Sequence, residues 1–171
     1  MSADLRSIMV GTMGLSVAVI VAAVLTISRE IRISALSELN RVRRVAAMTI
    51  VLQCAHFTEE WYTGFHRRFP EMLGLVPWSN TFFAFFNLIW IAIWCLCAAL
   101  LRIQPRILSF PIWFLAIASF LNGIGHPVLS IVSGGYFPGL WSSPFVGAAG
   151  LFLFRALSRL TGPSSVSGRG I

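Results

Sequence analysis

The sequence predicts an all-α integral membrane protein, built as a single bundle of about five transmembrane helices. Its 171 residues are 57% hydrophobic and only 11% charged, whereas soluble domains carry about 25% charged residues. The apolar residues gather in five segments, each close to the ~20 residues that cross the hydrocarbon core of a bilayer. Most arginines lie between these segments, as in the loops of multi-pass proteins of the cell membrane.

The first predicted span covers residues 8–27 and is too long for the apolar region of a signal peptide, which has about 7–15 residues. The second covers 45–65, and it can cross the membrane only if His56, Glu59 and Glu60 lie within the bilayer. Three more spans are expected, at 81–101, 107–132 and 140–160. Residues 1–160 would then form one transmembrane helical domain, followed by a disordered polar tail over 161–171.

The arginines predict how this bundle is oriented. With five spans, ten of the thirteen arginines fall on one side of the membrane, and only Arg6, Arg67 and Arg68 fall on the other. Cytoplasmic loops are enriched in basic residues, so we expect an external N-terminus and a cytoplasmic C-terminus. The arginine-rich connection 28–44 is expected to form a short amphipathic helix on the inner membrane surface.

The composition also excludes several classes of function. The net charge of +7 does not indicate nucleic-acid binding, because the arginines form no face or stripe. Cys54, Cys95 and Cys97 all lie in apolar segments and support neither a disulfide framework nor a zinc knuckle. No internal repeat is visible, so the doubled architecture of many secondary transporters could arise here only in a homodimer.

The second span carries a polar stripe. At about 100° per residue, five polar side chains share an arc of about 120°. They are Gln53, His56, Glu59, Glu60 and Thr63, while Phe57, Trp61 and Tyr62 point elsewhere. A stripe of this kind is expected to face the interior of a helix bundle.

The fourth span repeats the pattern. Its polar residues follow spacings of three, four and four along one helix face, and they are Ser119, Asn122, His126 and Ser130. Gly123 and Gly125 lie between them and are expected to let another helix approach closely. The third span adds one polar residue, Asn87.

The depths of these residues in the membrane agree. Glu59 and Asn122 each lie about 20 Å from the cytoplasmic start of their spans, at 1.5 Å per residue. Asn87 lies about 10 Å in from the outer end of a helix that runs the other way. The polar residues of three spans are therefore expected to meet in the outer half of the bilayer, beneath an external loop that carries Tyr136 and Pro138.

Adhesion between helices does not explain the charged members of this cluster. A carboxylate near the middle of the membrane costs about 2.5–3.5 kcal/mol on insertion scales, whereas an interhelical hydrogen bond contributes about 0.6 kcal/mol. We therefore expect a functional site made of His56, Glu59, Glu60, Asn122 and His126. The remaining polar residues are expected to hold the helices together through hydrogen bonds. They are Gln53, Thr63, Asn87, Ser119 and Ser130. Asn87 is also a candidate for contact with a substrate.

Three short motifs in this region resemble those of the HXXEE family of membrane proteins. They are His56-x-x-Glu59-Glu60, Asn122-x-x-x-His126 and Tyr136-x-Pro138-Gly139, found in that order between about residues 50 and 140. Each motif is weak alone, and the ordered set is specific. That family is a domain of unknown function, so the resemblance implies that these residues act as a set, with Tyr136, Pro138 and Gly139 beside the substrate, and it names no reaction.

The leading hypothesis is a metal-dependent membrane enzyme acting on a lipophilic or small substrate. His56, His126 and either Glu59 or Glu60 form a set suited to one divalent ion, Zn²⁺ or Fe²⁺, with a position left open. The other glutamate would serve as general base, and Asn122 would orient the substrate or stabilise an oxyanion.

Two alternatives remain open from the sequence. Adjacent buried carboxylates resist ionising together, so the site could instead be a metal-free acid–base enzyme or binder for a sterol-like or isoprenoid lipid. The same residues could also relay protons in a small transporter. A stripe confined to one half of the bilayer disfavours a complete transport path.

Overall fold

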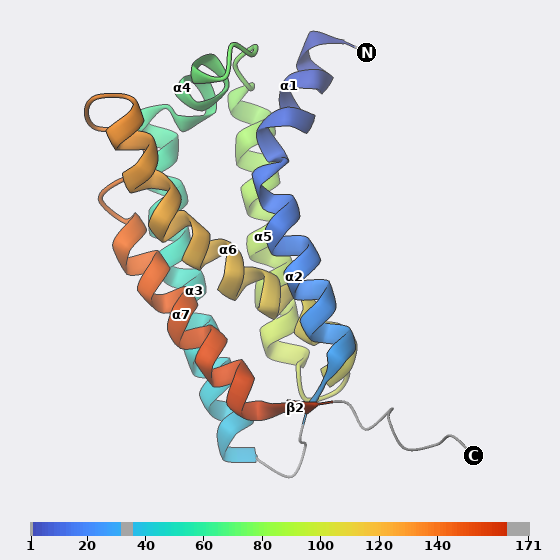
Figure 1. The fold of residues 1–171 in the computed structure, drawn as a ribbon. Coiled ribbons are helices and arrows are strands. Elements are labelled where there is room, and N and C mark those ends of the chain that lie inside the picture. The colour runs from blue at the N-terminus through green and yellow to red at the C-terminus, as the bar shows by residue number, and fades with distance from the viewer. Residues whose placement is uncertain (1, 32–35, 164–171) are drawn as a thin grey trace.

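The computed structural model describes residues 2–31 and 36–163, which form seven helices and two short strands (Figure 1). The helices are α1 (Ala3–Thr12), α2 (Gly14–Ser28), α3 (Leu36–Thr63), α4 (Phe65–Met72), α5 (Asn80–Leu100), α6 (Pro105–Val132) and α7 (Ser143–Leu160). The strands are β1 (Arg29–Ile31) and β2 (Thr161–Pro163). The predicted all-helical architecture is therefore confirmed, apart from this small ribbon.

Within the described residues, α5 and α6 are each long and apolar enough to cross a membrane. α1 and α2 together form a third candidate, but they meet at an angle of 51° around Met13. The first predicted span is thus a bent pair of helices rather than one straight helix. α3 and α7 carry more polar and charged residues, which lowers their mean hydropathy.

Helix α6 is central and packs against α7, α2 and α5, while α3 packs against α7 and α5. Figure 1 shows α1, α2 and α5 on one side of α6, and α3 and α7 on the other. The N-terminus and α4 lie at one end of the molecule, and the two strands lie at the opposite end. We refer to these as the α4 end and the ribbon end.

Two expectations about the connections are wrong. In the described part of residues 28–44, Arg29–Ile31 forms β1 and the residues from Leu36 onwards belong to α3, so no separate amphipathic helix is found there. The predicted tail starts with an ordered strand, since β2 pairs antiparallel with β1 and Arg29 Nε donates a 2.8 Å hydrogen bond to Thr161 Oγ1. Residues 164–171 lie outside the described chain.

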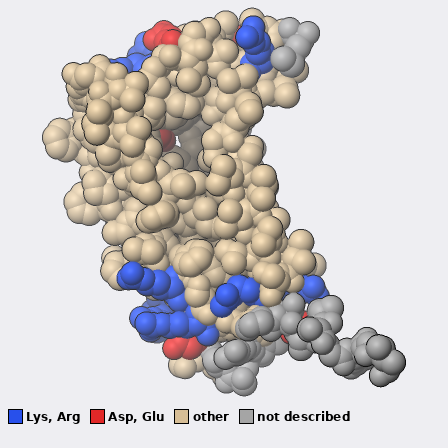
Figure 2. Space-filling model, viewed as in Figure 1, with Lys and Arg blue, Asp and Glu red and all other residues tan. Residues whose placement is uncertain are grey.

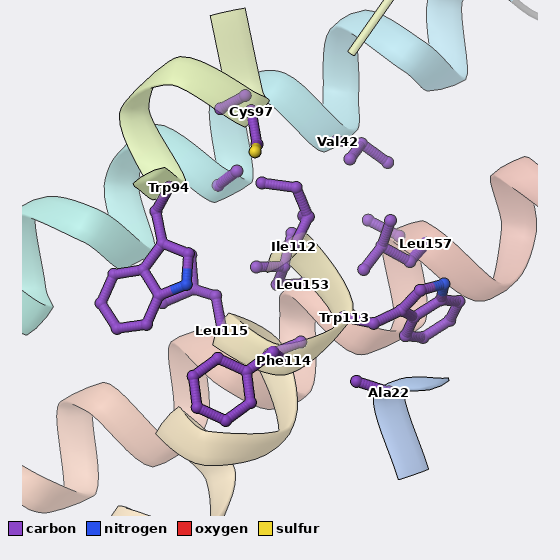
Figure 3. Close-up of a cluster of buried hydrophobic side chains, with 14 of the residues drawn as sticks. Ala22, Val42, Trp94, Cys97, Ile112, Trp113, Phe114, Leu115, Leu153 and Leu157 are labelled. Carbon is purple, nitrogen blue, oxygen red and sulfur yellow. The ribbon is translucent and has the colours of Figure 1, made fainter. Parts of the chain in front are cut away.

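A hydrophobic core fills the half of the bundle nearer the ribbon end (Figure 3). α6 contributes Ile112, Trp113 and Leu115, which are almost completely buried against α2, α3, α5 and α7.

Large apolar residues also face outwards around the bundle, among them Val17, Ile20, Met48, Val51, Phe85 and Phe152. Figure 2 shows charged residues concentrated at the two ends with a broad uncharged band between them, the surface expected of a membrane protein.

Glycines bring α6 and α7 into backbone contact. A Cβ at Gly123 would lie 2.6 Å from the Cα of Gly147, and a Cβ at Gly150 would lie 2.6 Å from the carbonyl oxygen of Ala116. Close approach through small residues is a common basis for helix association in membranes. The expectation is confirmed for Gly123 but not for Gly125, which has open space where its Cβ would be.

This contact predicts a difference between two otherwise matched substitutions. Gly123→Ala and Gly125→Ala both gain about 1 kcal/mol of helix propensity. Only Gly123→Ala forces α6 and α7 apart, at a cost of about 1–3 kcal/mol from overpacking. We expect Gly123→Ala to melt at a lower temperature than Gly125→Ala in the same detergent, and equal melting temperatures would contradict the contact.

Candidate metal centre

Three polar side chains from two helices converge at one buried point. Glu60 Oε1 lies 3.6 Å from His56 Nε2 and 3.3 Å from His126 Nε2. The three atoms all lie within 4.8 Å of one another, and all three residues are buried. His56 and Glu60 are one turn apart on α3, and α6 brings His126 to them with its ring edge-on to His56 at 4.7 Å between centroids.

The other ring nitrogen of each histidine already has a partner. His126 Nδ1 lies 2.6 Å from the carbonyl oxygen of Pro138, which can only accept a hydrogen bond. His56 Nδ1 lies 2.7 Å from Ser142 Oγ, and that hydroxyl donates its own proton to Glu59 Oε2 at 2.5 Å. Both Nδ1 atoms are therefore assigned as donors from the hydrogen-bond network. In the neutral rings, both Nε2 atoms then carry lone pairs.

Three hydrogen-bond acceptors thus face one another without a donor between them. His56 Nε2 has no hydrogen-bond partner among the described residues. An arrangement of this kind needs a cation, either a metal ion or an extra proton. Zn²⁺ ligands at about 2.0–2.2 Å in a tetrahedron lie about 3.3–3.5 Å apart, close to the separations of Glu60 Oε1 from the two nitrogens.

Glu59 does not join this group, although the sequence offered it as a ligand. Its Oε1 accepts from the hydroxyl of Tyr136 at 2.8 Å and the amide of Trp141 at 3.1 Å. Its Oε2 accepts from the amide and the hydroxyl of Ser142, at 2.8 and 2.5 Å. Burial raises the pKa of the Tyr136 phenol, and the carboxylate of Glu59 raises it further, so Tyr136 stays a neutral donor.

Ser142 is a site residue that the sequence analysis missed. Its hydroxyl links the carboxylate of Glu59 to the imidazole of His56, an arrangement that orients metal-binding histidines in many proteins. Ser142 is also the N-cap of α7, but its side chain makes no capping hydrogen bond. Its position before Ser143 and Pro144 indicates only a helix start, so nothing in the sequence marks it as part of a site.

The loop before α7 closes over both imidazoles. Pro138 supplies the carbonyl for His126, and Gly139 adopts a left-handed conformation with φ of +88°. A Cβ at Gly139 would lie 2.5 Å from Cε1 of His126 and 3.0 Å from Cε1 of His56. Glycine at this position therefore meets both a conformational and a steric requirement.

A cavity of about 280 Å³ adjoins two of the three converging side chains, Glu60 and His126. Glu60, His126, Asn87 and Asn122 lie on its wall, so polar residues from three helices share one cavity. Most of the remaining wall is aromatic and includes Phe65, Trp78, Phe83, Trp90 and Trp94. Figure 2 shows a hollow in the half nearer the α4 end, with acidic atoms visible inside it.

The residues on the cavity wall differ from the sequence analysis in two respects. Phe57 lines the cavity rather than pointing away from it, while Trp61 and Tyr62 are exposed as expected. Tyr136, Pro138 and Gly139 do not line the cavity, because they pack against Glu59 and the two histidines.

The two asparagines of the wall differ in whether their side-chain amides already form a hydrogen bond. Asn87 Nδ2 donates to the backbone of Phe83 at 2.9 Å. Asn122 makes no side-chain hydrogen bond within the described chain, so both ends of its amide are free to bind a ligand.

No protein-family model matches the chain, and the curated proteins and solved structures compared with it yielded no match either. The resemblance to the HXXEE family therefore stays a prediction that depends on the three motifs.

The four hydrogen bonds of Glu59 predict how the loop responds to its loss. Bonds to a charged group are worth about 1.5–3 kcal/mol each, so Glu59→Gln should loosen the segment that ends at Ser142. We expect the amides of Trp141 and Ser142 to exchange with solvent at least about tenfold faster, the factor that 1.4 kcal/mol represents. Hydrogen-exchange mass spectrometry measures this, and Glu71→Gln, at an exposed position on α4, is the control that should leave it unchanged.

Proposed function

We propose that this chain is a five-pass membrane enzyme whose divalent metal ion is held by His56, Glu60 and His126. One observation carries the proposal: three possible ligand atoms converge at a buried point, and both Nδ1 atoms are engaged elsewhere, so that the Nε2 atoms are the ones that face Glu60. Buried acceptors that face one another are costly unless a cation lies between them. Two imidazoles and one carboxylate suit Zn²⁺ or Fe²⁺.

The reacting side of the site would be the cavity. Glu60 and His126 contribute to its wall, so an ion between them has an open side that faces this space. When bound, such an ion polarises a substrate oxygen or lowers the pKa of a bound water. Asn122 lies on the same wall with an unengaged amide and would orient the substrate.

Glu59 would position the site rather than act as its base. Both of its carboxylate oxygens accept two hydrogen bonds, and the loop residues that supply them shield it from the cavity. Its role in the proposal is to hold Ser142 against His56. In this proposal Glu59 is therefore not the general base that was expected of the second glutamate.

The wall indicates a lipophilic substrate. Aromatic side chains dominate it, and a volume of about 280 Å³ is close to the lower end of the roughly 300–1,000 Å³ typical of small-molecule sites. The wall also includes Gly11 and Gly14, on either side of the bend between α1 and α2. A ligand dissolved in the bilayer could enter beside this bend.

Five spans are supported by the arrangement of the helices and their charges. Counting α1 and α2 as one bent span, the long segments alternate between the α4 end and the ribbon end (Figure 1). Of the arginines in the described residues, Arg6, Arg67 and Arg68 belong to the α4 end. Basic residues favour the cytoplasm, so the ribbon end would be cytoplasmic, the N-terminus external and the candidate metal centre in the outer half of the bilayer.

Metal analysis of protein purified without a histidine tag tests the proposal. We expect about one zinc or iron ion per chain, as for a mononuclear site. His56→Ala and His126→Ala should each lose it, because two remaining ligands bind an ion weakly. The remaining histidine, His66, is also buried but lies outside the converging group. His66→Ala is therefore the matched control and should keep the metal.

A pair of glycine variants serves the same test if a histidine variant does not fold. Gly134 and Gly139 both have positive φ, of 71° and 88°, so alanine strains either backbone. Only at Gly139 does the added Cβ press on the two imidazoles, since Gly134 has nothing within 4 Å. Gly139→Ala should lose metal and Gly134→Ala should retain it.

A metal-free acid–base enzyme is the second candidate. The 3.3 Å separation of Glu60 Oε1 and His126 Nε2 could instead hold a proton. Folded wild-type protein that carries no metal, with a lipid that co-purifies, would favour this candidate over the first.

Cysteine labelling tests the orientation separately. In a variant with Cys54, Cys95 and Cys97 replaced by serine, Arg41→Cys should react with an impermeant maleimide only after the membrane is opened. Arg67→Cys should react in intact cells. The reverse pattern would overturn the proposed orientation and leave the metal proposal untouched.

A further inference from the structure

A second concave site lies between α3 and α5, away from the candidate metal centre. It is a groove of about 570 Å³ that extends from Asn40 to Val51 along α3. On the α5 side it is lined by Cys95, Ala98 and Ala99. The eleven residue steps from 40 to 51 correspond to about 16 Å, half of the ~30 Å hydrocarbon core of a bilayer.

Small side chains create this groove. Ala47 from α3 and Ala98 and Ala99 from α5 leave the space between the two helices unfilled. Ile50 forms an apolar floor that is nearly buried, at 6% exposed. The middle of the groove therefore offers a narrow apolar channel that is open towards the lipid.

The end of the groove nearer the ribbon is basic. Arg43 and Arg44 lie there together with the amide of Asn40. Arg43 Nε donates to the carbonyl oxygen of Ala98 at 3.2 Å, which holds its guanidinium at the mouth of the groove. Neither arginine forms an ion pair with a carboxylate of the described chain.

We propose that this groove binds one anionic phospholipid, with its phosphate on Arg43 and Arg44 and an acyl chain along Ala47, Ile50 and Ala98. Guanidinium groups bind phosphate through charge-assisted, often bidentate hydrogen bonds. Basic pockets between membrane helices, at the cytoplasmic side, are typical sites for anionic headgroups. The groove continues from the two arginines to Val51, so a phosphate and the first part of an acyl chain can be bound together.

A helix from a second copy of the chain fits this groove less well. It would have to bring a carboxylate to both arginines, because an uncompensated buried charge is strongly destabilising. A phospholipid brings its own phosphate to the same place. The two occupants are separated by the experiment below.

Native mass spectrometry of the protein in detergent tests the proposal with two lipids of identical chains, phosphatidylglycerol and phosphatidylcholine. We expect one phosphatidylglycerol to be retained in preference to phosphatidylcholine. Arg43→Gln with Arg44→Gln should weaken phosphatidylglycerol binding by about 25-fold, about fivefold for each arginine. Arg155→Gln with Arg159→Gln removes the same charge from exposed positions on α7 and should change binding less than about twofold.

A third variant tests the apolar part of the groove. Ala47→Leu keeps both arginines and fills the channel, so it should weaken the binding of both lipids. Equal retention of the two lipids by wild type would overturn the proposal, as would equal losses in the two double variants. A dimer that forms without lipid and is lost in Ala47→Leu would assign the groove to a second copy instead.

Cys95 reports the location of the bound lipid directly. Its thiol is free, exposed and on the groove wall. With Cys54 and Cys97 replaced by serine, alkylation of Cys95 should slow when phosphatidylglycerol is added and remain unchanged with phosphatidylcholine. Metal content measured on the same samples should stay constant, so failure here and failure of the metal proposal are distinguishable.

Discussion

The carboxylate of Glu59 is the contact on which the site depends. It accepts hydrogen bonds from Tyr136, Trp141 and Ser142, which holds the loop before α7 against α3. That loop then sets both imidazoles, one through the Ser142 hydroxyl and one through the carbonyl of Pro138. The Glu59 carboxylate, which costs free energy to bury in an apolar bundle, thus orients the imidazoles of His56 and His126 beside Glu60.

Close packing elsewhere lets the bundle keep an open space beside this site. The backbone contact between Gly123 and Gly147 brings α6 and α7 together and places His126 next to His56. The tightly packed core lies nearer the ribbon end, whereas the cavity lies between α6, α5 and the bent α1–α2 pair. Rigid packing at one end and an aromatic cavity at the other suit a protein that binds a ligand within the membrane.

The two concave sites differ in chemistry as well as in place. The cavity is lined by aromatic rings and three side-chain amides and adjoins a group that needs a cation. The groove between α3 and α5 is narrow and aliphatic and ends in two arginines. A substrate site and a structural lipid site have these contrasting requirements, because one must orient a reacting group and the other must match a phosphate and an acyl chain.

The sequence by itself determined the helical class, the polar stripe on α3, and the candidate ligands His56, Glu59, Glu60 and His126, from which the converging group comes. Helical periodicity and the cost of charge in an apolar segment suffice for these, since both depend on local spacing and composition. Only the tertiary structure separated the adjacent glutamates into two roles. A difference of 100° around the helix turns Glu60 towards His126 and Glu59 towards the loop, and which partner lies in each direction depends on how α6 and α7 pack. The same holds for Ser142, whose importance comes from a contact with His56, 86 positions away in the chain.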